Sequence, residues 1–285
     1  MDSHVWRTVY QAIRAADKSV AREGRRKTFS DGQIVAMYLW SASHDRTLSW
    51  ACQRSSYGSA FRPRKLPSIS QFCKRIKTPR CDAMLQKVHA QLAEIGTMTD
   101  LSFIDGRALT VGAYSKDRDA KRGPAPGGMG RGYRLHAWAT QDQRIPIWSV
   151  MPLNVSEKTV AGELLNHQRA SGLILADGNY DAGWLYDRIA EAGGHLLTPL
   201  PENAGGGHRR QSPARMAAAQ AWQGTAGYTY RERLEIERTF GHTACFAGGL
   251  SHLPPWVRGL ERVRRWVGAK LIIYHARWQC RKRSA

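Results

Sequence analysis

Three acidic residues, Asp105, Asp177 and Glu237, are candidates for metal chemistry. Asp105 follows the mostly apolar run Leu101–Ile104, Asp177 follows the apolar run Leu173–Ala176, and Glu237 lies in a stretch rich in Arg and Glu. Hard divalent cations bind carboxylate oxygens, and two such ions can hold the attacking and leaving oxygens of a phosphoryl transfer. The three carboxylates therefore predict a Mg²⁺-binding site for phosphoryl transfer.

The charge of the chain indicates the kind of partner. The 285 residues include 43 Lys and Arg against 23 Asp and Glu, which gives a formal net charge of +20. A basic excess of this size points to a polyanion, most commonly nucleic acid, although an anionic membrane or another protein is the alternative. We expect double-stranded DNA as the partner, and the site as one for cutting and joining DNA strands.

Neither a membrane span nor a disulfide framework is expected. No segment approaches the ~18 consecutive apolar residues of a membrane span, and the first residues lack the basic-then-apolar order of a secretory signal. The 5 cysteines are widely spaced and form no Cys-x-x-Cys pair, which argues against disulfides and structural zinc and fits a reducing compartment. These features predict a cytoplasmic, nucleoid-associated protein that does not bind a membrane.

Residues 1–97 are predicted to form an all-helical DNA-binding region. Capping boxes are indicated by Ser30 with Gln33 and by Ser68 with Gln71. After Ser68 an apolar stripe is flanked by candidate phosphate-binding residues, namely Lys74, Arg75 and Lys77. This is the pattern of a helix that enters a DNA groove, and a helix-turn-helix near 47–78 would present it. An ordinary surface helix with solvated lysines is the alternative.

From residue 98 the pattern changes to mixed α/β. Strands are predicted at 101–105, 108–111, 133–139 and 145–151, the last two joined by a polar turn at 141–143, and again at 173–176 and 195–200. Helices are predicted after Ser156, around Trp184, from Tyr230 and over 256–277. The segment 115–131, rich in Lys, Arg, Gly and Pro, is predicted to be a mobile loop, and 201–227 a short insertion.

Four segments in this order resemble a DDE transposase of a bacterial insertion sequence: Ile104–Gly106, Gly132–His136, Ala176–Asp181 and Ile236–Phe240. The third is similar to the family's Ala-Asp-x-x-Tyr-Asp segment. The fourth lies in a stretch similar to the signature Tyr-x2-Arg-x3-Glu-x6-Lys.

In that signature Tyr230, Arg233 and Glu237 take the first three places, and Ala244 stands at the lysine position. The resemblance implies a ribonuclease-H-like mixed sheet flanked by helices over 98–285, with Asp105 on the first strand, Asp177 after the fourth and Glu237 on a later helix.

The resemblance also implies the chemistry. Asp105 would bridge two Mg²⁺ ions, for which Mn²⁺ is expected to substitute, while Asp177 and Glu237 flank them. Tyr230 and Arg233 would contact the DNA backbone near the scissile phosphate. The implied partners are the terminal inverted repeats of the element, the target DNA and a second copy of the chain in a homodimeric synapse.

Each residue has a plainer explanation. Asp-Gly is a common turn pair, so Asp105 and Asp177 could be turn residues, and Glu237 could belong to a solvated charge run. Asp181 competes with Asp177 as a ligand but is a better candidate for a helix cap. His136 and Trp222 could serve the site or simply pack. Ala244 leaves a second function open, that of a catalytically decayed or repurposed DNA-binding protein derived from a transposase.

Overall fold

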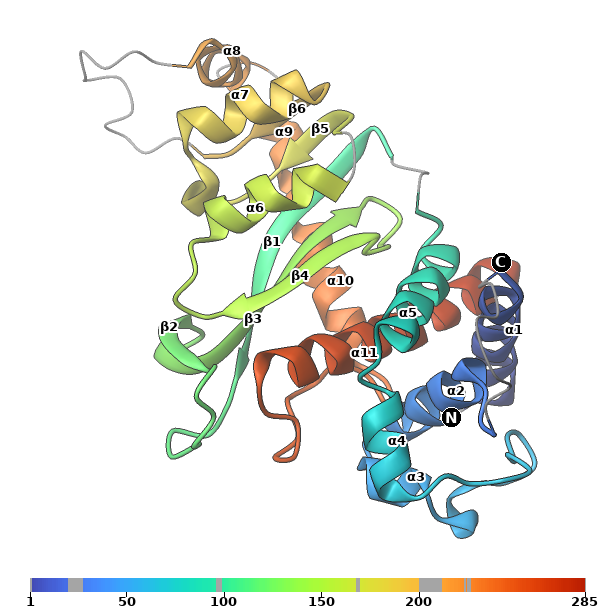
Figure 1. Cartoon of the computed structure of the whole chain (residues 1–285). Helices are drawn as coiled ribbons and strands as arrows, with labels where there is room; N and C mark the ends of the chain where they lie inside the picture. Colours follow the sequence, from blue (N-terminus) through green and yellow to red (C-terminus); the bar gives the residue numbers. More distant parts are fainter. Residues whose placement is uncertain are drawn as a thin grey trace. The chain divides into compact units, whose positions relative to one another are not determined.

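The computed structural model describes residues 2–19, 28–95, 99–167, 170–199, 212–222, 224 and 227–284. The chain divides into two compact units, the first made of Met1–Ile95 with Thr243–Ala285 and the second of Gly96–His242. Each unit has its own elements (Figure 1). The predicted domain limits, 1–97 and 98–285, place the C-terminal segment in the second domain, whereas its packing groups it with the N-terminal helices.

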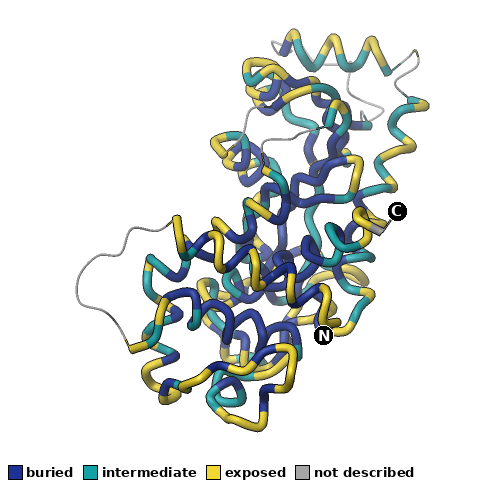
Figure 2. Tube along the Cα trace, turned by 90° about the vertical axis from the view of Figure 1, so that its right-hand side faces the viewer, coloured by how far each residue is buried: buried dark blue, intermediate teal, exposed yellow. Residues whose placement is uncertain are grey.

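The first unit is all-helical in the part that the structure describes. Its long helices are α1 (Ser3–Ser19), α2 (Asp31–Ser43), α5 (Pro79–Leu92) and α11 (Leu260–Ser284), which pack against one another. The helix α2 is buried on nearly every side from Ile34 to Ser43. A helix that is apolar all round belongs in a core. Exposed residues line the outer turns of each unit and buried ones the inside (Figure 2).

Both expected helix starts are found, but only one has the complete capping box. Ser68 accepts from the backbone of Gln71 at 3.2 Å, and the Gln71 side chain accepts from the backbone of Ser68 at 3.1 Å. Ser30 accepts from the backbone of Gln33 at 3.0 Å, but the Gln33 side chain donates to Lys65 O at 2.7 Å. The second half of the Ser30 box is therefore replaced by a tertiary contact.

The helices near 47–78 do not form the expected helix-turn-helix. They are α3 (Leu48–Ala51), the short 3₁₀ helix η1 (Arg54–Ser56) and α4 (Ile69–Arg75). A helix-turn-helix joins its helices by a turn of about 3 to 4 residues, whereas residues 52–68 separate α3 from α4. Ile69 is also exposed, so the predicted apolar stripe is buried only at Phe72 and Ile76.

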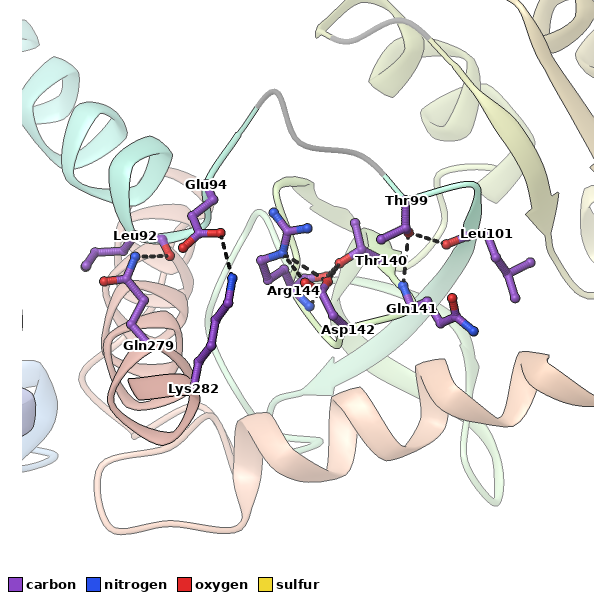
Figure 3. A network of polar contacts seen from close by, with 10 residues as sticks. All are labelled: Leu92, Glu94, Thr99, Leu101, Thr140, Gln141, Asp142, Arg144, Gln279 and Lys282. Carbon is purple, nitrogen blue, oxygen red and sulfur yellow. Dashed lines mark hydrogen bonds and ion pairs between the residues drawn. The ribbon is translucent and has the colours of Figure 1, made fainter. Parts of the chain in front are cut away.

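A buried lysine joins α11 to the rest of the first unit. Lys270 is 1% exposed, and its ammonium donates to Ala42 O at 2.6 Å, Asp45 Oδ1 at 2.6 Å and Gly248 O at 2.9 Å. Burial lowers the pKa of this ammonium, and Asp45 opposes that shift. Near the other end of α11 the contacts are more exposed: Gln279 donates to Leu92 O at 3.1 Å, and Lys282 lies 3.4 Å from Glu94 (Figure 3).

The second unit is built on one mixed sheet. Its strands are β1 (Leu101–Thr110), β2 (Lys121–Ala125), β3 (Gly128–Thr140), β4 (Ile147–Pro152), β5 (Gly172–Leu175) and β6 (Gly194–Leu197). The order is β2-β3-β1-β5-β6, and β4 pairs with β3. The long strand β3 is antiparallel to its neighbours, while β1, β5 and β6 run parallel.

The prediction of a mobile loop over 115–131 is wrong, because this segment forms β2 and the start of β3. Arg131 holds the preceding chain: its guanidinium donates to the carbonyls of Ser115 at 2.6 Å, Asp117 at 2.5 Å and Ala120 at 3.0 Å. Asp117 in turn accepts from the buried hydroxyl of Tyr133 at 2.7 Å. The glycines and basic residues that resemble a loop in sequence are therefore fixed by backbone pairing and by one arginine.

Helices cover both faces of this sheet (Figure 1). The helices α6 (Glu157–Leu164) and α7 (Gly183–Glu191) share a core with Ile104 and Trp138 on one face. The other face carries α10 (Leu234–Ala244), which follows α9 (Gly227–Thr229) and the 3₁₀ helix η5 (Tyr230–Arg233) in the chain. The helix α8 (Pro213–Ala221) instead packs against α7. Residues 201–211 of the predicted insertion lie outside the described residues. This mixed sheet flanked by helices is ribonuclease-H-like, as predicted.

Candidate active site

The pairing of β1 with β5 places two of the candidate carboxylates side by side. These strands are parallel, with Phe103 opposite Leu175, so Asp105 and Asp177 stand two positions further on at the same level. Adjacent strands lie about 4.8 Å apart. One carboxylate oxygen each from Asp105, Asp177 and Glu157 lie within 4.8 Å of one another. The sheet therefore brings Asp105 and Asp177 together.

The turn explanation does not apply to Asp105, because this residue lies inside β1 and pairs with Ala137. Its Oδ1 accepts from the backbone of Gly106 at 2.7 Å. Asp177 does occupy a turn: it caps the 3₁₀ helix η3 (Gly178–Tyr180) and accepts from the backbone of Asn179 at 2.9 Å. For Asp177 the turn fixes a carboxylate that also belongs to the cluster.

The third predicted carboxylate, Glu237, is on α10, whose position is set by the β3–β4 turn. The Gln143 amide donates to Glu235 at 3.3 Å and lies 2.8 Å from His242 Nδ1, so it contacts both ends of the helix. On the sheet, Arg107 donates to Phe240 O at 2.7 Å, and Ile236 is fully buried. These contacts direct the opposite side of α10, with Glu237, to solvent.

The turn that carries Gln143 is itself held by a small polar network (Figure 3). The hydroxyl of Thr140 donates to Asp142 at 2.5 Å, and Arg144 Nε donates to both oxygens of the same carboxylate at 2.9 Å. Gln143 has a positive φ of 67°, a conformation that is uncommon outside glycine. The predicted polar turn is confirmed, and it has the additional role of anchoring α10.

Arg233 connects Glu237 to the cluster. Its guanidinium lies 3.1 Å from Asp105 Oδ2 and 3.4 Å from Glu237 Oε1. The one-turn spacing of Arg233 and Glu237 therefore does place them on one side of the helix, as the sequence suggested. Glu237 is 59% exposed at its side chain and is not part of the close group of carboxylates among the described residues. A guanidinium separates it from Asp105.

The electrostatics of the site centre on Asp105. Burial raises the pKa of Asp105 to about 6, and the charges of Asp177 and Glu237 add to this shift. The hydrogen bond from Gly106 and the positive charge of Arg233 act against it. A carboxylate in this position gains from any cation that reaches it, because its charged form is poorly solvated.

The residue that the sequence did not reveal is Glu157. It is the first residue of α6, its side chain is 14% exposed, and it forms an ion pair with the buried guanidinium of Arg134. A side chain at Gly106 would come within 2.7 Å of Arg134 Cδ, which accounts for a glycine beside Asp105. An acidic residue in the first turn of a helix is common, so the sequence offered no signal for Glu157.

Tyr230 and Trp222 lie beside the carboxylates. The hydroxyl of Tyr230 donates to Ala176 O at 3.1 Å, next to Asp177, and so ties the start of η5 to the end of β5. The Trp222 and Tyr230 rings meet edge to face with centroids 4.9 Å apart. Trp222 therefore packs against a predicted DNA-binding residue.

The other predicted DNA-binding residues lie in the first unit, and they differ in exposure and in ion pairing. Lys74 and Lys77 are exposed. Arg75 is ion-paired with Asp31 at 2.5 Å and so links α4 to the start of α2.

The arginines that follow Ala244 also have partners. Arg258 and Arg262 donate to backbone carbonyls, Arg264 pairs with Glu261, and Arg265 lies 3.0 Å from Asp82. These side chains serve the first unit.

The interpretation of Asp181 as a helix cap is wrong. The cap position of α7 belongs to Ala182, and Asp181 instead forms a two-pronged ion pair with Arg215 of α8, with distances of 2.6 and 2.8 Å. This pair fixes α8 to the segment between η3 and α7 within the second unit. Asp181 therefore pairs with Arg215 and does not belong to the carboxylate group that contains Asp177.

The sheet and the carboxylates at adjoining parallel strands place the chain in the broad class of ribonuclease-H-like proteins with an acidic site. The family model described as the transposase DDE domain matches residues 97–275, and the chain belongs to this family. None of the curated proteins matches the chain. Among the described residues, no helix has the length and apolar character needed to cross a membrane.

His136 on β3 provides a pH-dependent prediction. It is 1% exposed, and neither ring nitrogen has a hydrogen-bond partner among the described residues. Burial lowers its pKa to about 3, with a contribution from Arg134. Because the unfolded chain binds the proton near pH 6.5, stability is full above that pH and is lost as the pH falls toward 3.

We expect the His136→Leu variant to lack this part of the acid sensitivity. Between pH 7 and pH 5 the wild-type protein should lose about 2 kcal/mol more of its free energy of unfolding than the variant. Urea unfolding at both pH values measures the difference. His195→Leu, which changes an exposed histidine on β6, is the control and should follow the wild type. Equal acid sensitivity of wild type and His136→Leu would show that His136 is protonated in the folded state.

Proposed function

We propose that the chain is a DNA transposase that binds the terminal inverted repeats of its element, cleaves the strands there and joins the freed 3′ ends to target DNA. The observation that supports this best is that Asp105 on β1 and Asp177, just past the end of the neighbouring parallel strand β5, lie in one carboxylate cluster, with Arg233 linking Asp105 to Glu237. Membership of the transposase DDE domain family points to the same chemistry.

The carboxylate cluster supports the proposal of a Mg²⁺ site, which the proposed chemistry would use with two ions. Mg²⁺ binds oxygen at about 2.1 Å, so two ligands on opposite sides of one ion lie about 4 Å apart. The cluster, with oxygens within 4.8 Å of one another, needs only small side-chain movements to reach this spacing. Asp105 would contact both ions, with Asp177 and Glu237 as flanking ligands and Mn²⁺ as a substitute. Bound ions would activate water or a 3′-hydroxyl and stabilise the leaving oxygen.

The protein's own groups have separate tasks. Arg233 pairs with both Asp105 and Glu237, and bound ions would free its guanidinium for a DNA phosphate. Tyr230 positions this arginine, since its hydroxyl is bonded beside Asp177. Positioning and charge neutralisation are the main protein contributions to phosphoryl transfer.

Basic residues outside the carboxylate site would bind the DNA. The exposed Lys74 and Lys77 of the first unit and the basic β2–β3 hairpin are candidates for phosphate contacts. Binding through phosphates weakens steeply with salt. Two element ends must meet for joining, which implies a homodimeric synapse on DNA in a cytoplasmic, nucleoid-associated protein.

The test is cleavage of a duplex carrying the element's end. With Mg²⁺, the intact chain should nick and join strands, and Asp177→Ala should bind the duplex but not cleave it. Glu232→Ala, which removes an exposed carboxylate from η5, is the control and should cleave normally. If neither the intact chain nor Asp177→Ala cleaves while both bind, the second function holds, that of a decayed DNA-binding protein. Ala244 at the signature lysine position is the observation that favours that alternative.

A further inference from the structure

Glu157 reaches the carboxylate cluster from a different element than the other acidic residues. It starts α6, and one of its oxygens lies within 4.8 Å of oxygens of both Asp105 and Asp177. Glu237, the third carboxylate of the proposed centre, stands outside this group among the described residues. Three carboxylates this close repel one another unless a cation compensates them.

Two arginines supply positive charge of this kind. Arg134 pairs with Glu157, and Arg233 pairs with Asp105. Both guanidinium groups are largely buried, with 7% and 19% of their side chains exposed. Each also has a buried Nε with no hydrogen-bond partner among the described residues. The two positive charges equal the charge of one divalent cation.

A buried hydroxyl beside the cluster lacks a partner. Tyr180 is fully buried, and its Oη makes no hydrogen bond among the described residues. After burial, the charges that shift the pKa of this hydroxyl are those of Asp105, Asp177, Arg134 and Arg233, so it lies near the cluster. An unsatisfied buried hydroxyl is costly, and an oxygen-rich ligand, such as a hydrated cation, would satisfy it.

We propose that Glu157 is a fourth carboxylate of the metal centre, and that the guanidinium of Arg134 takes the place of the cation beside Glu157 when no cation is bound. This inference rests on the proposed function, because it assumes that Asp105 and Asp177 bind divalent ions. Glu157 would be a direct oxygen ligand, and Tyr180 would bond a water of the same cation. The competing explanation is that Glu157 and Arg134 form a structural ion pair that only fixes α6 to β3.

Titration of the DNA-free chain with Mn²⁺, followed by the electron paramagnetic resonance signal of the free ion, separates these explanations. Glu157→Gln should weaken Mn²⁺ binding by at least about 10-fold, the size typical of changes close to a metal. Glu157→Asp keeps the charge and the possibility of pairing with Arg134 but withdraws the carboxylate by one methylene group, so it should also weaken binding. Glu163→Gln, on the exposed side of α6, should bind as the wild type does.

The Arg134→Gln variant should change the Mn²⁺ affinity in the opposite direction. It removes the guanidinium that competes with the cation for Glu157, so Mn²⁺ binding should become tighter. Circular dichroism shows whether this variant folds, and the Glu157 variants decide the matter without it. Wild-type affinity in Glu157→Gln, or in Glu157→Asp alone, would overturn the role of Glu157 as a ligand. If Asp177→Asn then still weakens binding, the proposed function stands without this inference. Absence of Mn²⁺ binding by the wild-type protein would overturn both.

Discussion

Replacing Asp105 by asparagine is expected to abolish strand cleavage and, at the same time, to stabilise the metal-free protein. The activity should fall by at least about 10³-fold, because the residue that contacts both proposed ions no longer carries a charge, and ions of this kind supply several kcal/mol of transition-state stabilisation. DNA binding should remain, since the basic surfaces are unchanged.

The gain in stability follows from the raised pKa of Asp105. Burial raises this pKa to about 6, so above pH 6 the folded protein holds a charge that the unfolded chain solvates better. The cost is present above the folded pKa and disappears as the pH falls to the unfolded value near 4. At pH 8 with a chelator, the free energy of unfolding of Asp105→Asn should therefore be about 1 to 3 kcal/mol higher than that of the wild type.

Denaturant unfolding at pH 8 and pH 4 measures both halves of this prediction. The advantage of Asp105→Asn should shrink at pH 4, where the wild-type carboxyl is protonated in the folded protein and about half protonated in the unfolded chain. Substantial cleavage by Asp105→Asn would remove Asp105 from the metal centre. A variant less stable than the wild type at pH 8 would show that the pairing with Arg233 outweighs the burial of the carboxylate.

The second large effect concerns Lys270. Its replacement by methionine keeps the length of the side chain but leaves Gly248 O without its ammonium donor and Asp45 without its cation. Gly248 O is buried, and a buried carbonyl left unsatisfied costs about 1 to 3 kcal/mol, whereas the half-exposed Asp45 loses a hydrogen bond from a charged group, which contributes about 1.5 to 3 kcal/mol. We expect Lys270→Met to lower the free energy of unfolding by about 3 kcal/mol, as measured by urea denaturation.

Lys282 on the same helix is the matched control. Its ion pair with Glu94 is largely exposed (Figure 3), and exposed pairs contribute about 0 to 1 kcal/mol. Lys282→Met should therefore be nearly neutral. Equal effects of the two substitutions would mean that the buried contacts of the Lys270 ammonium contribute no more to the free energy of unfolding than an exposed ion pair does.

Most of the second unit could be predicted from local sequence. The alternation of apolar residues located β3 and β4, and the apolar runs before Asp105 and Asp177 located β5 and the first half of β1, whose predicted segments 101–105 and 108–111 form one strand. The spacing of Arg233 and Glu237 predicted their contact, because residues four apart on a helix share a side. These predictions depend only on periodicities of the backbone.

The remainder depends on contacts between distant parts of the chain. Glu157 looks like an ordinary helix-starting acid until the sheet brings it to Asp105. The hairpin of β2 and β3 looks like a loop because its order comes from Arg131 bonding to backbone carbonyls. No local pattern records such contacts.

The return of residues 243–285 to the N-terminal helices has a consequence for biosynthesis. As a ribosome makes the chain from its N-terminus, α1, α2 and α5 emerge long before α11, against which all three pack. The second unit lies between them in the sequence, so its residues are all synthesised before the first unit has received α11. Nascent chains should therefore depend on protection of the apolar α2 until translation has passed α11.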